Sequence, residues 1–175
     1  MDRNYFGRVK NRAIARAAAR SSALSGLLIR SFKPSGTEGE IPWAPLSKPL
    51  SQCRVALVTT AGVHHRNQEP FDMADGDGDP SFRVIDAARP LETLTITHDY
   101  YDHADADRDI NVVFPIERLR ELAAQGIIGG VSDVHIGFMG HIVGRHVRTL
   151  TERTAPEAAG ILKGAGVDVV ILTPG

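Results

Sequence analysis

The chain has 175 residues, of which 42% are hydrophobic and 23% are charged, and its formal net charge is −1. This composition is typical of a globular domain. So small a net charge creates no overall electrostatic attraction for nucleic acids or anionic membranes. A single cysteine, Cys53, excludes an internal disulfide and a metal site with several cysteines. No apolar run reaches the roughly 18 residues that a membrane span needs. The sequence therefore predicts a cytoplasmic protein with no nucleic-acid partner and no membrane partner.

Residues 1–33 form a basic segment in which Asp2 is the only acid. Alanine-rich sequence with apolar residues at three- to four-residue spacing predicts a basic N-terminal helix whose charged face is solvated. A mitochondrial transit peptide has a similar composition, but a surface helix is the simpler interpretation.

Residues 34–52 are rich in proline, glycine and serine, which excludes a helix or a central strand. They predict a connector, and Trp43 and Leu46 are expected to hold it against the body by burying apolar area. The remaining residues, 53–175, are expected to form one α/β domain.

The clearest element in that domain is residues 54–62, a continuous apolar run that ends in small residues. This pattern is typical of a buried parallel strand followed by a functional loop, here residues 63–80. Further strands are predicted over residues 82–85, 91–97 and 166–173, and helices over residues 114–126 and 151–164. The order predicts a parallel or mixed sheet with helices on its faces, a three-layer flavodoxin- or Rossmann-like fold.

The last predicted strand runs directly into Pro174 and Gly175, where the sequence ends. In an open α/β sheet, ligands and reactive groups lie beyond the carboxyl ends of the strands. The crossover helix that normally follows such a strand is absent, so the fold is expected to be incomplete at its C-terminus. An exposed apolar edge strand favours self-association, and we therefore expect a homo-oligomer.

Histidines in the loops after strands are the main candidates for chemistry, because the imidazole ring titrates near neutral pH. His64, His98 and His141 have this position, whereas His135 and its apolar neighbours favour a structural role. Residues 105–109 alternate carboxylates as a calcium loop does, but the glycine and closing glutamate of that motif are missing. His98 and His103 match no tight zinc spacing. We therefore expect solvated acidic loops and assign no metal site.

Five segments, taken in order and with their spacing, resemble the selenoprotein B family of the glycine, sarcosine, betaine and D-proline reductases. The resemblance covers the chain from Trp43 to its end, without the basic helix. The segments are Trp43-Ala-Pro-Leu46 with residues 54–64, residues 105–120, Gly126-Ile-Ile-Gly-Gly130, Gly137-Phe-Met-Gly-His141 and Asp168-Val-Val-Ile-Leu-Thr-Pro-Gly175.

The resemblance implies a redox residue, selenocysteine or cysteine, directly after the loop formed by Thr173, Pro174 and Gly175. Selenocysteine is encoded by UGA, which is ordinarily a stop codon. The 175 residues are therefore expected to be the N-terminal portion of a longer selenoprotein, inactive without that residue and holding no cofactor of their own.

The same resemblance implies reductive cleavage of a C–N bond in a small amino-acid-like substrate, together with partner subunits of a reductase. His64, His98 and His141 would line the crevice as proton donors or substrate contacts. Substrate-binding positions are expected at Thr60, Gly62, Tyr100, Asp105 and Asn111, with Asp105, Asp107 and Asn111 acting chiefly by ordering their loop.

Two other functions fit the residues. One is a non-catalytic module that binds a small amine or carboxylate with the same loops. The other is a metal-dependent enzyme built on the His and Asp loops. No Walker loop, dinucleotide fingerprint or nucleophile elbow is present in the sequence.

Overall fold

The computed structural model describes residues 5–31 and 44–175. These residues fall into two units. The N-terminal unit contains residues 5–31, 44–47 and 99–102, and the α/β body contains residues 48–98 and 103–175. The described helices include none that is long and apolar enough to cross a membrane.

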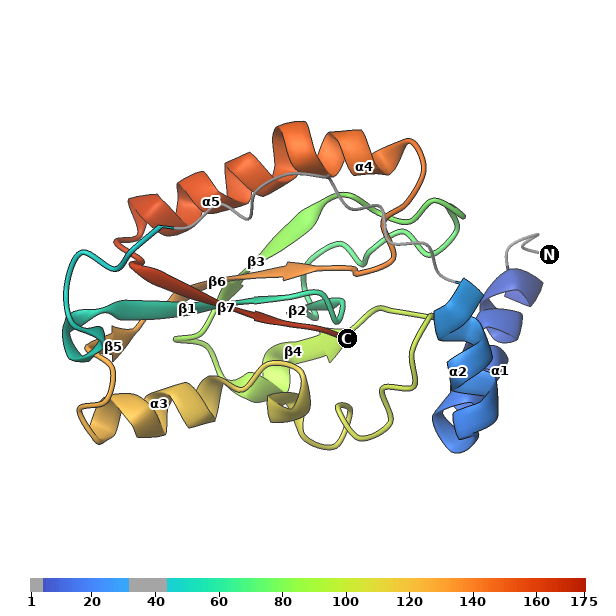
Figure 1. The fold of residues 1–175 in the computed structure, drawn as a ribbon, viewed down its shortest axis with the longest axis horizontal. Coiled ribbons are helices and arrows are strands. Elements are labelled where there is room, and N and C mark those ends of the chain that lie inside the picture. The colour runs from blue at the N-terminus through green and yellow to red at the C-terminus, as the bar shows by residue number, and fades with distance from the viewer. Residues whose placement is uncertain (1–4, 32–43) are drawn as a thin grey trace. The chain divides into compact units, whose positions relative to one another are not determined.

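The α/β body is built on a mixed five-stranded sheet with β1 (Arg54–Thr59) at its centre (Figure 1). Three strands pair with β1 in parallel, namely β5 (Gly130–Val131), β6 (Val134–Phe138) and β7 (Val169–Thr173). Val58 pairs with Ile136 of β6 and with Leu172 of β7, so these two strands lie on opposite sides of β1. β3 (Phe82–Asp86) completes the sheet as the antiparallel partner of β6.

Helices cover both faces of this sheet, α3 (Ile116–Ala124) on one face and α5 (Ala155–Gly164) on the other (Figure 1). Ala56, Ile136 and Phe138 of the sheet form a buried cluster with Ala158 and Leu162 of α5. Burial of such side chains contributes about 25 cal/mol for each Å² of apolar surface removed from water. The predicted α/β fold with helices on the faces of a mixed sheet is confirmed.

The second predicted helix begins earlier than residue 151. A short helix α4 (His146–Thr149) continues through a π-helical turn η4 (Leu150–Thr154) into α5. Pro156 stands in the first turn of α5 and has no N–H to donate. A wider π turn just before it accommodates the missing hydrogen bond, because π-bulges arise where the i→i−4 ladder is interrupted.

Residues 63–65 were predicted to lie in a loop, and this prediction is wrong. They form β2 (Val63–His65), which pairs antiparallel with β4 (Leu94–Ile96) in a separate two-stranded sheet. All three residues of β2 are buried, so they lack the apolar–polar alternation that would have predicted a strand. The predicted strand over residues 91–97 is shorter than expected, because the 3₁₀ turn η2 (Leu91–Thr93) follows Pro90. Two further 3₁₀ turns are η1 (Leu50–Gln52) and η3 (Ile110–Val112).

His135 supplies a hydrogen bond at a point where the pairing between strands is interrupted. The pairing register with β1 shifts by two residues between β5 and β6, across Ser132 and Asp133. The N–H of Leu57 therefore donates to His135 Nδ1 at 2.8 Å, and His135 Nε2 donates to the carbonyl of Ser132 at 2.7 Å. Burial lowers the pKa of His135 to about 4, so the ring is neutral, as an acceptor nitrogen requires. The structural role expected for this histidine is confirmed.

The N-terminal unit contains two helices instead of the predicted single helix. α1 (Tyr5–Arg20) ends before Ser21, and α2 (Ser22–Ser31) begins after it. The N–H of Leu24 donates to Ser21 Oγ at 3.4 Å, which is the N-cap geometry that starts a new helix. The expectation that Leu46 anchors the connector is wrong, because its side chain is 54% exposed. Trp43 and most of the predicted connector lie outside the described residues.

Replacing His135 tests its role in the sheet. The substitution His135→Leu leaves the buried N–H of Leu57 without an acceptor, which costs about 1–3 kcal/mol of unfolding free energy. Urea denaturation at pH 7.5 measures this loss. An unchanged unfolding free energy would contradict this role.

The same residue gives the wild-type chain a pH dependence. Its folded pKa of about 4 lies below the ordinary value of 6.5, so stability is full above pH 6.5 and decreases as the pH falls toward 4. The unfolded chain takes up a proton there that the folded ring does not, at up to about 1.4 kcal/mol per pH unit. His64 and His65 add losses of the same sign, so the difference between the wild type and His135→Leu isolates the His135 contribution.

Candidate functional site

The carboxyl ends of β1, β6 and β7 lie at one end of the sheet, because the three strands are parallel. We call this region the carboxyl edge. It is the place where reactive groups lie in α/β folds. The chain leaving β1 is held here by its neighbours, since the N–H of Thr60 donates to the carbonyl of Thr173 at 2.9 Å and Ala61 forms an antiparallel bridge with Met139.

Gly175 lies directly against the loop that follows β1. A Cβ atom built on Gly175 would overlap Cα and Cβ of Ala61, so no larger residue fits there without displacing the loop. The end of β7 is fixed as well, because Thr173 Oγ1 donates to the carbonyl of Val113 at 2.8 Å. Thr59 Oγ1 donates to the same carbonyl at 3.0 Å. The segment 173–175 therefore has a defined position at the carboxyl edge.

Glycine is required at a second position of this edge. Gly62 has a φ of 75°, which favours glycine, and a Cβ there would overlap the carbonyl of Thr97. The loop after β1 thus packs directly on the end of β4. His98 follows Thr97, is buried, and lies beside Gly62. The structure therefore brings together Thr60, Gly62, His98 and the segment 173–175, which the sequence placed in one site.

His64 lies behind this loop and has both ring nitrogens engaged. Its Nδ1 donates to the carbonyl of His65 at 2.8 Å, and its Nε2 is 2.8 Å from Thr97 Oγ1. Burial lowers the pKa of His64, and the charge of Arg83 lowers it further, against the opposing effect of the His65 carbonyl. The ring is therefore neutral near pH 7. Its contact with the Thr97 hydroxyl offers one route for proton exchange, and its catalytic role stays a prediction.

His65 has a structural role that the sequence did not reveal. The N–H of Asp86 donates to His65 Nε2 at 3.0 Å, and His65 Nδ1 donates to Thr93 Oγ1 at 2.9 Å. This ring joins β2 to β3 and to the turn before β4. Its neighbours are remote in sequence, so the only available signal was its position next to His64.

His141 contacts the acidic segment of residues 72–79. Its Nε2 donates to the carbonyl of Gly76 at 3.1 Å. Its own carbonyl lies so close to Gly78 that a Cβ there would overlap it. Gly78 and Ile142 form an isolated β-bridge. His141 thus lies two residues after Met139 of the carboxyl edge but is directed toward this acidic segment.

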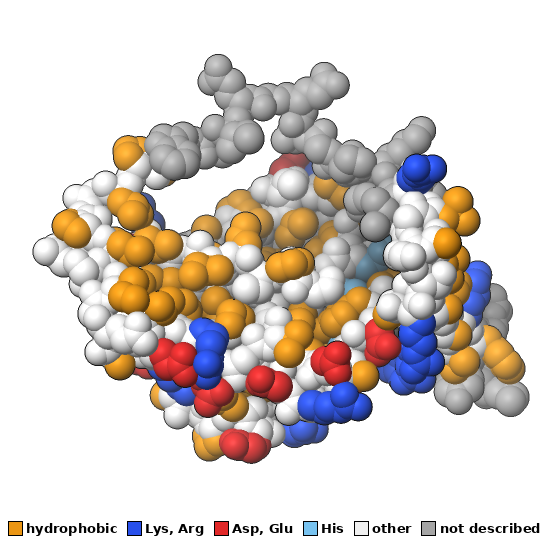
Figure 2. All heavy atoms as spheres, turned by 60° about the horizontal axis from the view of Figure 1, so that its bottom comes forward, with side chains coloured by type: hydrophobic (Ala, Val, Ile, Leu, Met, Phe, Trp, Pro, Cys, Tyr) orange, Lys and Arg blue, Asp and Glu red, His pale blue; other side chains and the backbone are white. Residues whose placement is uncertain are grey.

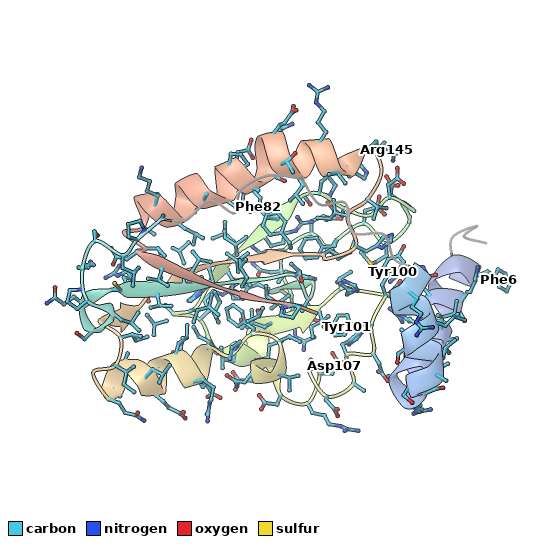
Figure 3. All side chains as sticks on the ribbon, in the orientation of Figure 1. Phe6, Phe82, Tyr100, Tyr101, Asp107 and Arg145 are labelled. Carbon is cyan, nitrogen blue, oxygen red and sulfur yellow. The ribbon has the colours of Figure 1, made fainter. Side chains whose placement is uncertain are left out.

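The acidic segment 72–79 was predicted to be a solvated loop, and this is wrong for two of its carboxylates. Asp75 accepts from His146 Nε2 at 2.9 Å and pairs with Arg145, which lies where the chain enters α4 (Figure 3). The hydrogen bond from His146 lowers the pKa of Asp75. Asp79 accepts from the N–H of Asp72 at 2.9 Å and folds the segment on itself. The basic partners lie some 70 residues away in sequence, where no local pattern shows them.

The segment 103–111 is held by contacts between its side chains and by contacts with Glu117 at the start of α3. Asn111 accepts from the N–H of Glu117 at 3.0 Å and donates to Glu117 Oε2 at 2.7 Å, so it fixes the start of α3. His103 pairs with Asp107 at 2.7 Å, and exposed Asp105 pairs with Arg108 at 2.9 Å. Asp107 projects from the loop before η3 (Figure 3).

A cavity of about 440 Å³ lies between this segment and β4. Asn111 and Asp107 line it together with Arg66 and Thr95, whereas Asp105 does not. The substrate contacts expected at Asp105 and Asn111 stay predictions.

Asp99 is the charged centre of the N-terminal unit. Its two carboxylate oxygens accept from Arg8 Nε at 2.6 Å and from Arg12 Nε at 2.7 Å, and its side chain is only 1% exposed. Burial by itself would raise the pKa of Asp99, but the hydrogen bonds from the two guanidinium groups lower it below the ordinary value. Two arginines of the basic face expected on α1 thus pair with Asp99, while their side chains stay 40% and 50% exposed. Tyr100, an expected substrate contact, belongs to this unit and not to the α/β body.

Within the described ranges 5–31 and 44–175, no group of three or more His, Cys, Asp or Glu side chains could hold a metal ion. Cys53 is buried at the amino end of β1 and directs its Sγ toward the carbonyl of Pro49 at 3.4 Å.

Comparison with known proteins adds an independent result. Residues 32–175 match the family described as glycine/sarcosine/betaine reductase selenoprotein B. The D-proline reductase subunit gamma of Acetoanaerobium sticklandii is 43% identical over 133 residues, which are 76% of this chain and 53% of that subunit. No solved structure matches the chain.

Two glycine reductase subunits are also similar. The component B subunit gamma of Carboxydothermus hydrogenoformans is 29% identical over 98% of this chain and 39% of its own length. The corresponding subunit of Symbiobacterium thermophilum is 32% identical over 90% of this chain and 38% of its own length. The chain thus spans about half, or less, of the length of these relatives.

Replacing Asp99 tests the charged centre of the N-terminal unit. The variant Asp99→Asn loses the charge that both guanidinium groups bind, at a local cost of about 1–2 kcal/mol, reduced by the partial exposure of the arginines. Amide hydrogen exchange along α1 should accelerate. Because the folded pKa of Asp99 is lowered, acidification through that pKa should have the same effect on the wild type.

The variant Asp105→Asn serves as the matched control, since it removes an exposed ion pair with Arg108. Equal exchange rates along α1 in the two variants would contradict the role of Asp99.

Proposed function

Because the chain belongs to the glycine/sarcosine/betaine reductase selenoprotein B family, we propose that it forms the part of a reductase component that directly precedes the redox residue. One observation carries the proposal: Gly175 lies against Ala61, at the carboxyl edge shared by β1, β6 and β7. A selenocysteine or cysteine attached after Gly175 would begin beside the loop that follows β1. Reactive groups of α/β proteins are found at this end of the sheet.

The proposed reaction is the reductive cleavage of a C–N bond in a small amino-acid-like substrate. The substrate gains two electrons and two protons, and the electrons come from thiol or selenol groups that become oxidised. His98 is a candidate proton donor at the carboxyl edge, since it lies beside Gly62. His64 would relay a proton through Thr97, and His141 would act from the loop after β6. The 175 residues without that redox residue should not catalyse this reaction.

The relatives are named as subunits of reductases or of reductase complexes. We accordingly propose that this protein works with partner subunits, which would supply the electrons and deliver or release the substrate. This part of the proposal rests on those names and on family membership.

A binding module is the second candidate. The cavity of about 440 Å³ beside β4 favours it, because it is lined by Arg66 and Asn111 and is large enough for a small carboxylate. Titration of the 175-residue chain with glycine and D-proline tests this function, since it requires no redox residue.

Extending the chain tests the proposed reductase function. We expect the genomic DNA after the codon for Gly175 to begin with UGA or a cysteine codon and to continue in frame. The extended protein with cysteine at that position should reduce D-proline or glycine in the presence of dithiothreitol. The 175-residue chain should show no activity above background.

The matched control is the extended protein with serine at the same position. It should fold equally well and lack activity. Equal activity of the serine and cysteine forms, or a second stop codon directly downstream, would contradict the proposal.

A further inference from the structure

The outer edge of β7 is an exposed edge of the sheet in the α/β body. Within the described part of the chain, β7 pairs with β1 and with no other strand. Val170 and Ile171 are each 39% exposed and Leu172 is 75% exposed, and β7 contains no charged residue. Edge strands are normally protected by lysine, proline or a bulge. Hydrophobic side chains gather on the side of the molecule seen in Figure 2, above a row of charged side chains.

The uncovered part of β7 faces a groove beside α5. Val170 and Leu172 pair with Ala56 and Val58, so they lie on the sheet face that α5 covers. Ala158 and Leu162 of α5 pack over β1 and β6 and leave the β7 part of this face open. The resulting groove has a volume of about 480 Å³ and is lined mainly by apolar side chains, among them Val58, Phe138, Ala159, Leu162 and Val170.

The dimensions of the groove favour one additional helix. Helices pack 8–10 Å apart, and neighbouring strands lie about 4.8 Å apart. A helix placed next to α5 would therefore lie over β7 and over one strand beyond it. A second copy of the chain, paired edge to edge through β7, would place the two α5 helices about 19 Å apart, roughly four strand spacings. That arrangement leaves the groove open, whereas one helix fills it.

Chain topology also favours one additional helix in the groove. β6 and β7 are parallel, lie on opposite sides of β1, and are joined through α4, η4 and α5. Connections of this kind are right-handed in about 98% of cases. A further right-handed connection that continues outward from β7 must place its helix on the same face as α5. That position is the groove.

We propose that the outer edge of β7 and this groove bind the strand-and-helix segment that follows β7 in the longer reductase polypeptide. The strand pairs with β7, and an amphipathic helix places its apolar side beside α5. The relatives have the necessary additional length, because this chain covers only 53% of the D-proline reductase subunit and 39% of the Carboxydothermus subunit. The proposal rests on family membership, and its test requires no catalytic activity.

The test uses the full 175-residue chain and a synthetic peptide probe. The probe is the segment that follows the β7-equivalent strand in the Acetoanaerobium relative, long enough for one helix and one strand. Amide hydrogen exchange and light scattering are measured with and without it. We expect a 1:1 complex in which exchange over residues 169–173 slows at least tenfold.

Two variants locate the binding surface. Leu172→Lys adds a charge at the edge and should weaken binding of the peptide at least tenfold, whereas Ile127→Lys, at another exposed apolar residue, should leave it unchanged. Both sites are exposed, so both variants should fold, as circular dichroism would verify. The proposal is overturned if the peptide gives no protection of β7. It is also overturned if the chain alone forms dimers that Leu172→Lys dissociates, since a second copy is then the occupant.

Failure of this test leaves the redox prediction standing, because cysteine-dependent activity of the extended chain is measured separately. Loss of that activity with intact peptide binding would in turn reject only the reductase function.

Discussion

The structure depends on the complete burial of β1. Val55, Ala56 and Leu57 are almost fully inaccessible to solvent, and both edges and both faces of the strand are covered. A buried backbone must have every N–H and C=O group paired. Where β5 and β6 fall out of register, the imidazole of His135 accepts the hydrogen bond that a carbonyl would otherwise accept. The loop after β1, and with it the carboxyl edge, takes its position from this strand.

The ion pairs in the described part of the chain connect its own segments to one another. Asp99 pairs with two arginines of α1, Asp75 pairs with Arg145 and accepts a hydrogen bond from His146, and the segment 103–109 pairs its own charges. Acidic segments that resemble metal loops in sequence thus act as structural anchors. His64 and His135 are neutral for a different reason, since burial removes the water that would stabilise a charged ring.

Sequence patterns predicted the elements whose signals are local. The apolar run of β1, the stripe of α3 and the final strand β7 were all evident, because burial of a strand or of one helix face requires a characteristic spacing. Features that depend on distant partners were missed. β2 becomes a strand only because β4 pairs with it, and Arg8 meets Asp99 across 91 positions. The role of His65 depends on a backbone N–H that no side-chain pattern reveals. For His135 the apolar neighbours indicated a structural role but not its backbone partner.

The pairing of β1 with β7 also constrains how the protein can fold during synthesis. Arg54, at the start of β1, meets Asp168, just before β7, across 114 positions. Contacts of such long range form late, because closing a long loop costs conformational entropy before any contact forms. Until β7 leaves the ribosome, one edge of the buried strand β1 has no partner. A nascent chain that stalls before residue 169 would therefore present β1 to chaperones or to aggregation, and the synthesis of β7 ends this exposure.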